Sequence, residues 1–75
     1  MDNIINVKLS TKTDLKEFME CVVKLSGRAR AVQGDTNVDA RSTLGIASIM
    51  ESGPFEVRFI ECNPDEINNF NKWKV

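Results

Sequence analysis

The stretch Val38-Asp39-Ala40-Arg41-Ser42-Thr43-Leu44-Gly45-Ile46-Ala47-Ser48-Ile49 lies in the second half of the chain, and the other segments are organised around it. Apolar residues in its later part recur with helical spacing, which predicts a short helix over residues 42–49. Ser42 is expected at the N-cap, where its hydroxyl oxygen can accept a hydrogen bond from a free amide of the first turn. Those amides and the helix dipole also favour negative charge, so a phosphate would be tolerated on this serine. The sequence leaves two interpretations open, a helix cap alone or a cap that is also modified.

Alternating apolar and polar residues on both sides of this stretch predict four strands. They cover residues 4–9, 28–33, 37–40 and 55–59, with a tight turn at residues 34–36 between the second and the third. In the second strand, Ala29, Ala31 and Gln33 share one face, and Arg28, Arg30 and Val32 share the other. The expected hairpin therefore presents small residues to the core and arginines to the opposite side.

Two further helices are predicted from apolar spacing and capping residues. Residues 14–25 form an amphipathic helix with an apolar stripe (Leu15, Phe18, Met19, Val22, Leu25), which we expect Thr13 to cap and Gly27 to end in a left-handed conformation. Asn63-Pro64-Asp65-Glu66 begins a last helix, because it supplies a capping Asn, a Pro at the first helical position and two acids near the positive end of the dipole. Ile67, Phe70 and Trp73 then face the core at one-turn spacing.

The order βαββαβα predicts a single α+β domain over residues 1–75, with three helices on one face of a four-stranded antiparallel sheet. The net charge of −1, from 10 basic and 11 acidic residues, gives no general attraction to nucleic acid or to an anionic membrane. No apolar run is long enough to span a bilayer, and Met1-Asp2-Asn3 begins no signal peptide, so we expect a cytoplasmic protein.

The residues that most often carry catalysis and metal binding are scarce in this chain. It has no histidine, which removes the commonest general base, and no base stands near Ser42 in the sequence. Cys21 and Cys62 form no zinc or redox pattern and are expected to pack as small hydrophobic residues. We therefore expect no enzyme, no catalytic residue, no metal, no cofactor and no small-molecule substrate.

With these elements in place, the chain resembles the HPr family, the small phosphocarrier proteins of the bacterial sugar phosphotransferase system. Residues 38–49 look like the regulatory-serine motif of that family, in which a basic residue precedes the serine and an aliphatic-Gly-aliphatic helix follows. Asn63-Pro64-Asp65-Glu66 is similar to the start of the family's last helix, and the match runs without a gap from Leu15 to Trp73. The resemblance implies an open-faced sandwich with the strand order 1-4-2-3.

The departures from the family pattern decide the expected function. The family's phosphohistidine motif, G-x-H-x-R-P, is replaced by the shorter Ser10-Thr11-Lys12-Thr13-Asp14, which contains none of its His, Arg and Pro. The resemblance therefore implies a regulatory or interaction protein that carries no phosphate on histidine, with Ser42 as the candidate phosphoacceptor. Its implied partners are a serine kinase of the HPr type or a transcriptional regulator, and the implied partner surface comprises Arg41, Leu44 and Ala47. Thr43 and Ala47 are less bulky and apolar than the family's usual residues, which reduces the expected apolar patch.

Two alternatives follow from the residues themselves. The strand parities place basic residues on the open face of the sheet, together with Glu56, and this face would suit an RNA or an acidic protein partner. The basic residues are Lys8, Arg28, Arg30 and Arg58. We do not expect nucleic acid, because no aromatic residue falls on that face to stack with bases. The other alternative is a member of the family that keeps only the fold, in which Ser42 contributes stability alone.

Overall fold

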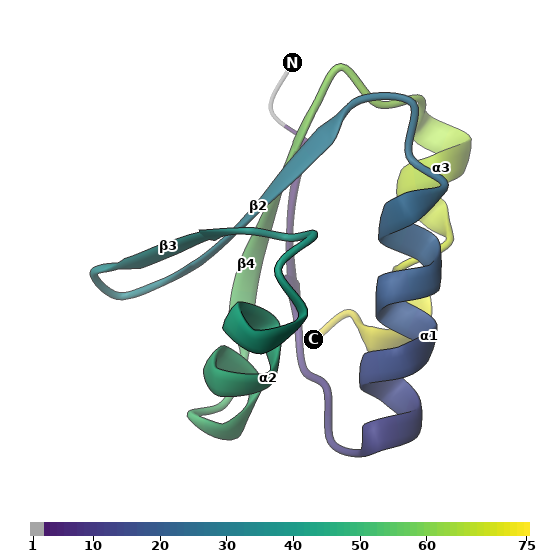
Figure 1. Cartoon of the computed structure of the whole chain (residues 1–75). Helices are drawn as coiled ribbons and strands as arrows, with labels where there is room; N and C mark the ends of the chain where they lie inside the picture. The colour runs from purple at the N-terminus through teal and green to yellow at the C-terminus, as the bar shows by residue number, and fades with distance from the viewer. Residues whose placement is uncertain (1–2) are drawn as a thin grey trace.

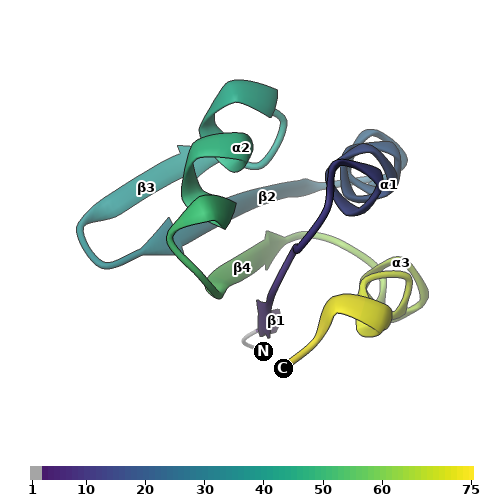
Figure 2. The same ribbon diagram turned by 90° about the horizontal axis from the view of Figure 1, so that it is seen from below.

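The computed structural model of the chain describes residues 3–75 and shows one layer of helices packed on one face of an antiparallel sheet (Figure 1). The strands follow the order β1-β4-β2-β3, as the family resemblance implied, and the helices lie on one side of the sheet (Figure 2). The elements are β1 (Asn3–Val7), α1 (Lys12–Val23), β2 (Arg28–Gln33), β3 (Thr36–Asp39), α2 (Thr43–Glu51), β4 (Phe55–Ile60), α3 (Pro64–Asn68) and a 3₁₀ turn, Asn71–Trp73.

The core lies between the sheet and the helices and is centred on Phe18 of α1. The Phe18 ring meets the rings of Phe55, Phe70 and Trp73 edge to face, with centroids 5.9, 5.3 and 5.7 Å away. This geometry is the favoured one for aromatic pairs, because the positive edge of one ring faces the negative face of the other. Aromatic residues of α1, β4 and the C-terminal segment therefore meet at the Phe18 side chain.

Helix α1 begins two residues before the predicted start, and its cap is Thr11 instead of Thr13. The Thr11 hydroxyl accepts a hydrogen bond from the Asp14 amide at 3.0 Å, and the Asp14 carboxylate accepts from the Thr11 amide at 3.3 Å. This reciprocal pair is a capping box, which needs an acceptor three residues after the cap. Asp14 stands three residues after Thr11, and this spacing decides between the two threonines.

Gly27 does not adopt the left-handed conformation that was predicted for it. Helix α1 ends at Lys24, which has an ordinary helical backbone, and the glycines with positive φ in residues 3–75 are Gly34 and Gly53. Gly27 is instead required by a close approach, since a methyl group there would overlap the carbonyl oxygens of Ile60 and Glu61. Glu61 itself has φ 59°, and its turn brings the end of β4 against the start of β2.

The end of the chain completes the sheet edge beside β1. The amide of Lys8 donates to the carbonyl oxygen of Trp73 at 2.9 Å, and the amide of Val75 donates to that of Asn6 at 2.9 Å. β1 ends at Val7, earlier than predicted, where its pairing with β4 ends at Phe55, and the tail covers backbone groups that an edge strand would leave unpaired. The predicted last helix is divided into α3 and the 3₁₀ turn, yet Ile67, Phe70 and Trp73 are buried as expected.

The hairpin and the remaining boundaries differ from the prediction by one or two residues. Gln33 pairs with Thr36, so Gly34 and Asp35 form a two-residue turn and β3 begins one residue early. Gly34 has φ 57°, as such tight hairpin turns require. None of the helices in residues 3–75 has the length and apolar character of a membrane span.

Acid should destabilise this fold through Asp14 and Glu66. Hydrogen bonds lower both pKa values, chiefly from the Ser10 amide to Asp14 and from the Asn63 amide to Glu66. A carboxylate whose pKa is lower in the folded state stabilises it above the unfolded pKa, ordinarily 3.8 for Asp and 4.5 for Glu, and this contribution disappears as pH falls through the folded value. Thermal unfolding followed from pH 7 downward should therefore show a falling midpoint in acid. The fall should be smaller in Glu66→Gln, whereas Asp65→Asn, which changes the adjacent residue, should keep it.

Candidate functional site

Ser42 occupies the N-cap of α2, as the sequence predicted. Its hydroxyl oxygen accepts a hydrogen bond from the Gly45 amide at 3.1 Å, and its carbonyl oxygen accepts from the Ile46 amide at 2.9 Å. The preceding turn is fixed by Asp39, whose carboxylate accepts from the Arg41 amide at 2.9 Å and whose carbonyl oxygen accepts from the Ser42 amide at 2.9 Å. The Ser42 side chain is therefore held in one orientation although it is exposed to solvent.

Gly45 allows α2 to start this close to β3. A methyl group on Gly45 would lie 3.0 Å from the Ser42 oxygen and 3.2 Å from a methyl carbon of Val38. Both contacts are tighter than ordinary van der Waals contact, so a larger residue would disturb the serine and the strand together. Close packing against Ser42 and Val38 thus explains why residue 45, in the aliphatic-Gly-aliphatic stretch, is a glycine.

The first turn of α2 differs electrostatically from those of the other two α-helices in residues 3–75. Helix α1 has Asp14 in its first turn and α3 has Asp65 and Glu66, whereas α2 has no acidic residue there. The positive end of the α2 dipole is therefore not compensated by a carboxylate of its own first turn. An added negative group on Ser42 would lie at the first-turn amides of α2 and next to Arg41 in the chain, with no acid in that turn.

Two substitutions of Ser42 should separate the contribution of its cap from the effect of an added negative charge. Ser42→Ala should lower the free energy of unfolding by about 1 kcal/mol, because the Gly45 amide loses its acceptor. Ser42→Asp should keep the cap and gain about 0.3–1 kcal/mol over the wild type from the dipole, an advantage that decreases at high salt. Urea unfolding at low and high ionic strength measures both effects, and Ser48→Ala, an exposed change later in α2, is the matched control. An Asp variant that is no more stable than the wild type at low ionic strength would show that the dipole has no effect at this position.

The predicted partner residues around Ser42 differ in their exposure to solvent. Leu44 projects into solvent with 85% of its surface exposed, and Arg41 is also exposed. Ala47 is half-buried and lies at the bottom of a shallow hollow between the start of α1 and the end of α2, beside Leu15 and Met50. Arg41 and Leu44 are therefore exposed to solvent, whereas Ala47 lines the hollow.

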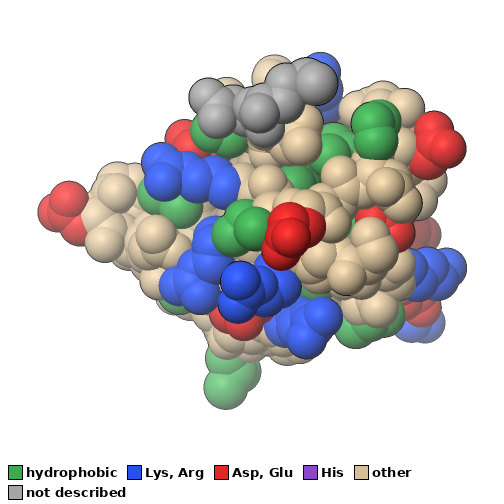
Figure 3. Space-filling view, turned by 90° about the horizontal axis from the view of Figure 1, so that it is seen from above, with side chains coloured by type: hydrophobic (Ala, Val, Ile, Leu, Met, Phe, Trp, Pro, Cys, Tyr) green, Lys and Arg blue, Asp and Glu red, His purple; other side chains and the backbone are tan. Residues whose placement is uncertain are grey.

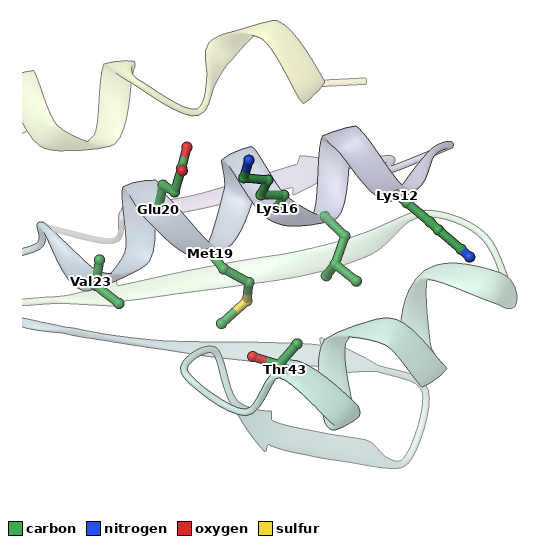
Figure 4. A pocket seen from close by; sticks show the side chains of 7 residues that line it. Lys12, Lys16, Met19, Glu20, Val23 and Thr43 are labelled. Atoms are coloured by element: carbon green, nitrogen blue, oxygen red, sulfur yellow. The ribbon is translucent and has the colours of Figure 1, made fainter.

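A larger groove, which the sequence did not reveal, runs along α1 beside the start of α2 (Figure 4). It has a volume of about 450 Å³, and Thr43 of α2 closes one side. The Met19 side chain points toward Thr43, whereas Glu20 and Lys16 lie on the outer side of α1. The other lining residues are Lys12, Leu15 and Val23. The floor is apolar and basic side chains stand at the rim, which suits an apolar side chain of a partner.

Gln33 of β2 holds the C-terminal end of α2 in place. Its side-chain amide nitrogen donates to the carbonyl oxygens of Ile49 and Pro54, both at 3.1 Å, and lies 3.3 Å from that of Gly53. These contacts join the last turn of α2 and the following loop to β2. The sequence placed Gln33 on the core side of the strand but gave no sign that it binds a helix end, because its partners are distant in the chain.

Residues 10–14, which the resemblance aligns with the phosphohistidine motif, cap the start of α1 through Ser10, Thr11 and Asp14. The Asp14 carboxylate accepts from the amides of Ser10 and Thr11, at 2.9 and 3.3 Å, and from the Trp73 indole nitrogen at 3.4 Å. The chain's own acid therefore occupies amides at the start of α1 that could otherwise bind an incoming anion. Its negative charge would also oppose a phosphate at this position.

The basic residues of the open face come together as the strand parities predicted, on the side of the sheet away from α2. Arg58 on β4 lies opposite Arg30 on β2, and Arg28 on β2 lies opposite Ile60 on β4. Lys8 is exposed just beyond the end of β1. Both cysteines are free thiols packed half-buried against the core, and burial raises the pKa of the Cys21 thiol. Within residues 3–75, no cluster of three or more acidic, cysteine or histidine side chains could hold a metal ion.

Comparison of the chain with family models, with curated proteins and with solved structures found no match.

Proposed function

We propose that this chain is a regulatory interaction protein related to the HPr family, which is switched by phosphorylation of Ser42 and transfers no phosphate through histidine. A serine kinase of the HPr type would supply the phosphate from ATP, and the product would bind a protein partner such as a transcriptional regulator. The proposal rests on the resemblance of residues 38–49 to the regulatory-serine motif. The observation that supports it best is the exposed capping serine on the one α-helix of residues 3–75 whose first turn contains no acid.

The surroundings of Ser42 favour both the reaction and its recognition. The Ser42 oxygen is accessible, so a kinase can approach it, and the resulting phosphate would lie at the positive end of the dipole beside Arg41. Leu44 and the groove beside Thr43 offer apolar contacts next to the modified residue. A partner could therefore read the phosphate and the apolar surface together, which makes its binding conditional on the modification.

The chemistry at the start of α1 supports the proposal that the chain transfers no phosphate through histidine. A relay needs a nitrogen that accepts phosphate and releases it readily, and the chain contains no histidine. Phosphate esters of Ser10, Thr11 or Thr13 would be stable and could not serve as such a donor. The Asp14 contacts add electrostatic repulsion at the same place.

The proposal is tested by incubating the full chain with ATP and a serine kinase of the HPr type, followed by intact mass spectrometry and fragment mapping. We expect one phosphate on Ser42 in the wild type and none in Ser42→Ala. Ser48→Ala is the matched control, because Ser48 is an exposed serine on the same helix, and it should be phosphorylated like the wild type. A wild-type chain that gains no phosphate, or gains it elsewhere, would overturn the proposal.

A further inference from the structure

The face of the sheet opposite the helices combines arginine with exposed aliphatic side chains. Figure 2 shows no helix on this side of the sheet. Ile4 of β1 and Ile60 of β4 are 45% and 39% exposed on this face, and Arg28 and Arg58 are exposed there as well. We call the set Lys8, Arg28, Arg30, Arg58, Ile4 and Ile60 the arginine face.

Strand pairing concentrates positive charge at the centre of this face. Arg58 lies directly opposite Arg30 on β2 and opposite Ile4 on β1. Like charges in cross-strand positions destabilise a sheet, so this pair is unfavourable for folding alone. Its persistence in the sheet is explained if the two guanidinium groups serve a ligand that brings negative charge.

The contacts within the sheet leave part of this charge without an acidic partner. Arg58 is paired with Glu56, with 2.6 Å between nitrogen and oxygen, whereas Arg30 binds the neutral side chain of Asn37 at 2.9 Å. Asp39 lies opposite Arg30, but its carboxylate accepts from the Arg41 amide. Among residues 3–75, neither Arg28 nor Arg30 forms a salt bridge. The guanidinium groups of both residues can therefore donate hydrogen bonds to the carboxylates of a partner.

The chain distributes its two basic residue types unevenly. Three of its four arginines belong to this face, whereas five of its six lysines lie elsewhere. Arginine is enriched at protein interfaces and lysine is depleted, because the planar guanidinium group binds carboxylates in a fixed geometry and is weakly hydrated. Seen from above, on the side where β2 starts and β4 ends, Lys and Arg side chains lie near hydrophobic side chains and an acidic one (Figure 3).

We propose that the arginine face docks a protein segment that carries carboxylates interspersed with aliphatic side chains. Charge complementarity supports this occupant, because four basic side chains face only Glu56 and Asp39 here although the net charge of the chain is −1. The exposed isoleucines supply apolar contact between the guanidinium groups. A nucleic acid fits less well, because the four Phe and the one Trp of the chain are all buried and provide no stacking platform.

This surface lies on the opposite side of the sheet from α2, so it is independent of the switch proposed for Ser42. Ser42→Ala should leave binding to the arginine face unchanged, and loss of the arginines should leave phosphorylation unchanged. The two proposals can therefore fail separately.

The test begins with a random peptide library displayed on phage and selected on the full chain. The sequences that are enriched should combine Asp or Glu with Ile, Leu or Val. The best peptide is then titrated into labelled full-length protein and followed by NMR, where the shifted amides should lie on β2 and β4. Its dissociation constant should rise at least about tenfold in Arg30→Gln with Arg58→Gln, and should also rise with salt. Lys16→Gln with Lys24→Gln, on the exposed face of α1, is the matched control and should bind like the wild type.

Several results would overturn the proposal. These are selection without enrichment, peptides that lack acidic residues, shifts confined to α1 and α2, or undiminished binding in the arginine double variant. Single-stranded oligouridylate that binds this face more tightly than the selected peptide would overturn it as well. Should the Gln variant unfold, Arg30→Lys with Arg58→Lys keeps the charge but removes the planar guanidinium group, and we expect it to bind the peptide more weakly than the wild type; equal affinity would overturn the proposal.

Discussion

Replacing Leu44 with glutamate is expected to lower kcat/KM for phosphorylation of Ser42 by an HPr-type kinase about tenfold or more, without loss of stability. Leu44 is 85% exposed, so its side chain contributes little to the core, and it stands two residues from the phosphoacceptor. A protruding aliphatic residue of this kind gains free energy only when a partner covers it. A carboxylate there would leave a charge in an apolar contact and would repel the phosphate donor.

The control for this prediction is Val75→Glu. Val75 is 67% exposed and lies beside β1, away from α2, so its replacement adds the same charge to the chain at another site. Kinase assays on both variants, with urea unfolding to confirm equal stability, separate a local contact from an effect of net charge. Equal slowing by the two changes would show that Leu44 is no part of the docking surface.

Phe18→Ala should reduce the free energy of unfolding by about 3–5 kcal/mol. Phe18 is fully buried, and its ring contacts the rings of Phe55, Phe70 and Trp73, so its removal leaves a cavity where α1, β4 and the C-terminal segment meet. A domain of this size has a small core, so the loss is a large fraction of its total stability.

Urea denaturation of Phe18→Ala measures this loss, and Val23→Ala is the comparison on the same helix. Val23 is 67% exposed, so its truncation should cost no more than about 0.5 kcal/mol. A Phe18→Ala chain nearly as stable as the wild type would mean that the four rings do not form the centre of the core.

Local patterns were sufficient for most of the fold. The alternation in residues 28–33 predicted β2 with its bounds and faces, and Ser42 was predicted as the cap of α2. Thr11 was also readable in principle, since Asp14 follows it at capping-box spacing. The repeat of three between Ile67, Phe70 and Trp73 matches the 3₁₀ period better than the α-helical one, which is consistent with the break after Asn68.

The features that escaped prediction depend on contacts between distant segments. Gly27 is fixed by the backbone around Glu61, and β1 ends at Val7, where its pairing with β4 ends. The groove and the neighbouring hollow exist because Thr43 and Ala47 are too small to cover Leu15 and Met19, which the periodicity of α1 had placed in the core. Spacing along one element shows which residues are apolar, but the size of the side chains opposite decides how far they are buried.

We propose that this chain accepts phosphate on Ser42 but does not carry it in the phosphohistidine relay of the HPr family. The most direct measurement exposes the full chain in parallel to two donors and counts phosphates by intact mass spectrometry. One sample receives ATP with the serine kinase, and the other receives phosphoenolpyruvate with the enzyme that phosphorylates HPr proteins on histidine. We predict a single acid-stable phosphate on Ser42 in the first sample and none in the second. Phosphate transferred from phosphoenolpyruvate, or an ATP sample with Ser42 unmodified, would contradict the account.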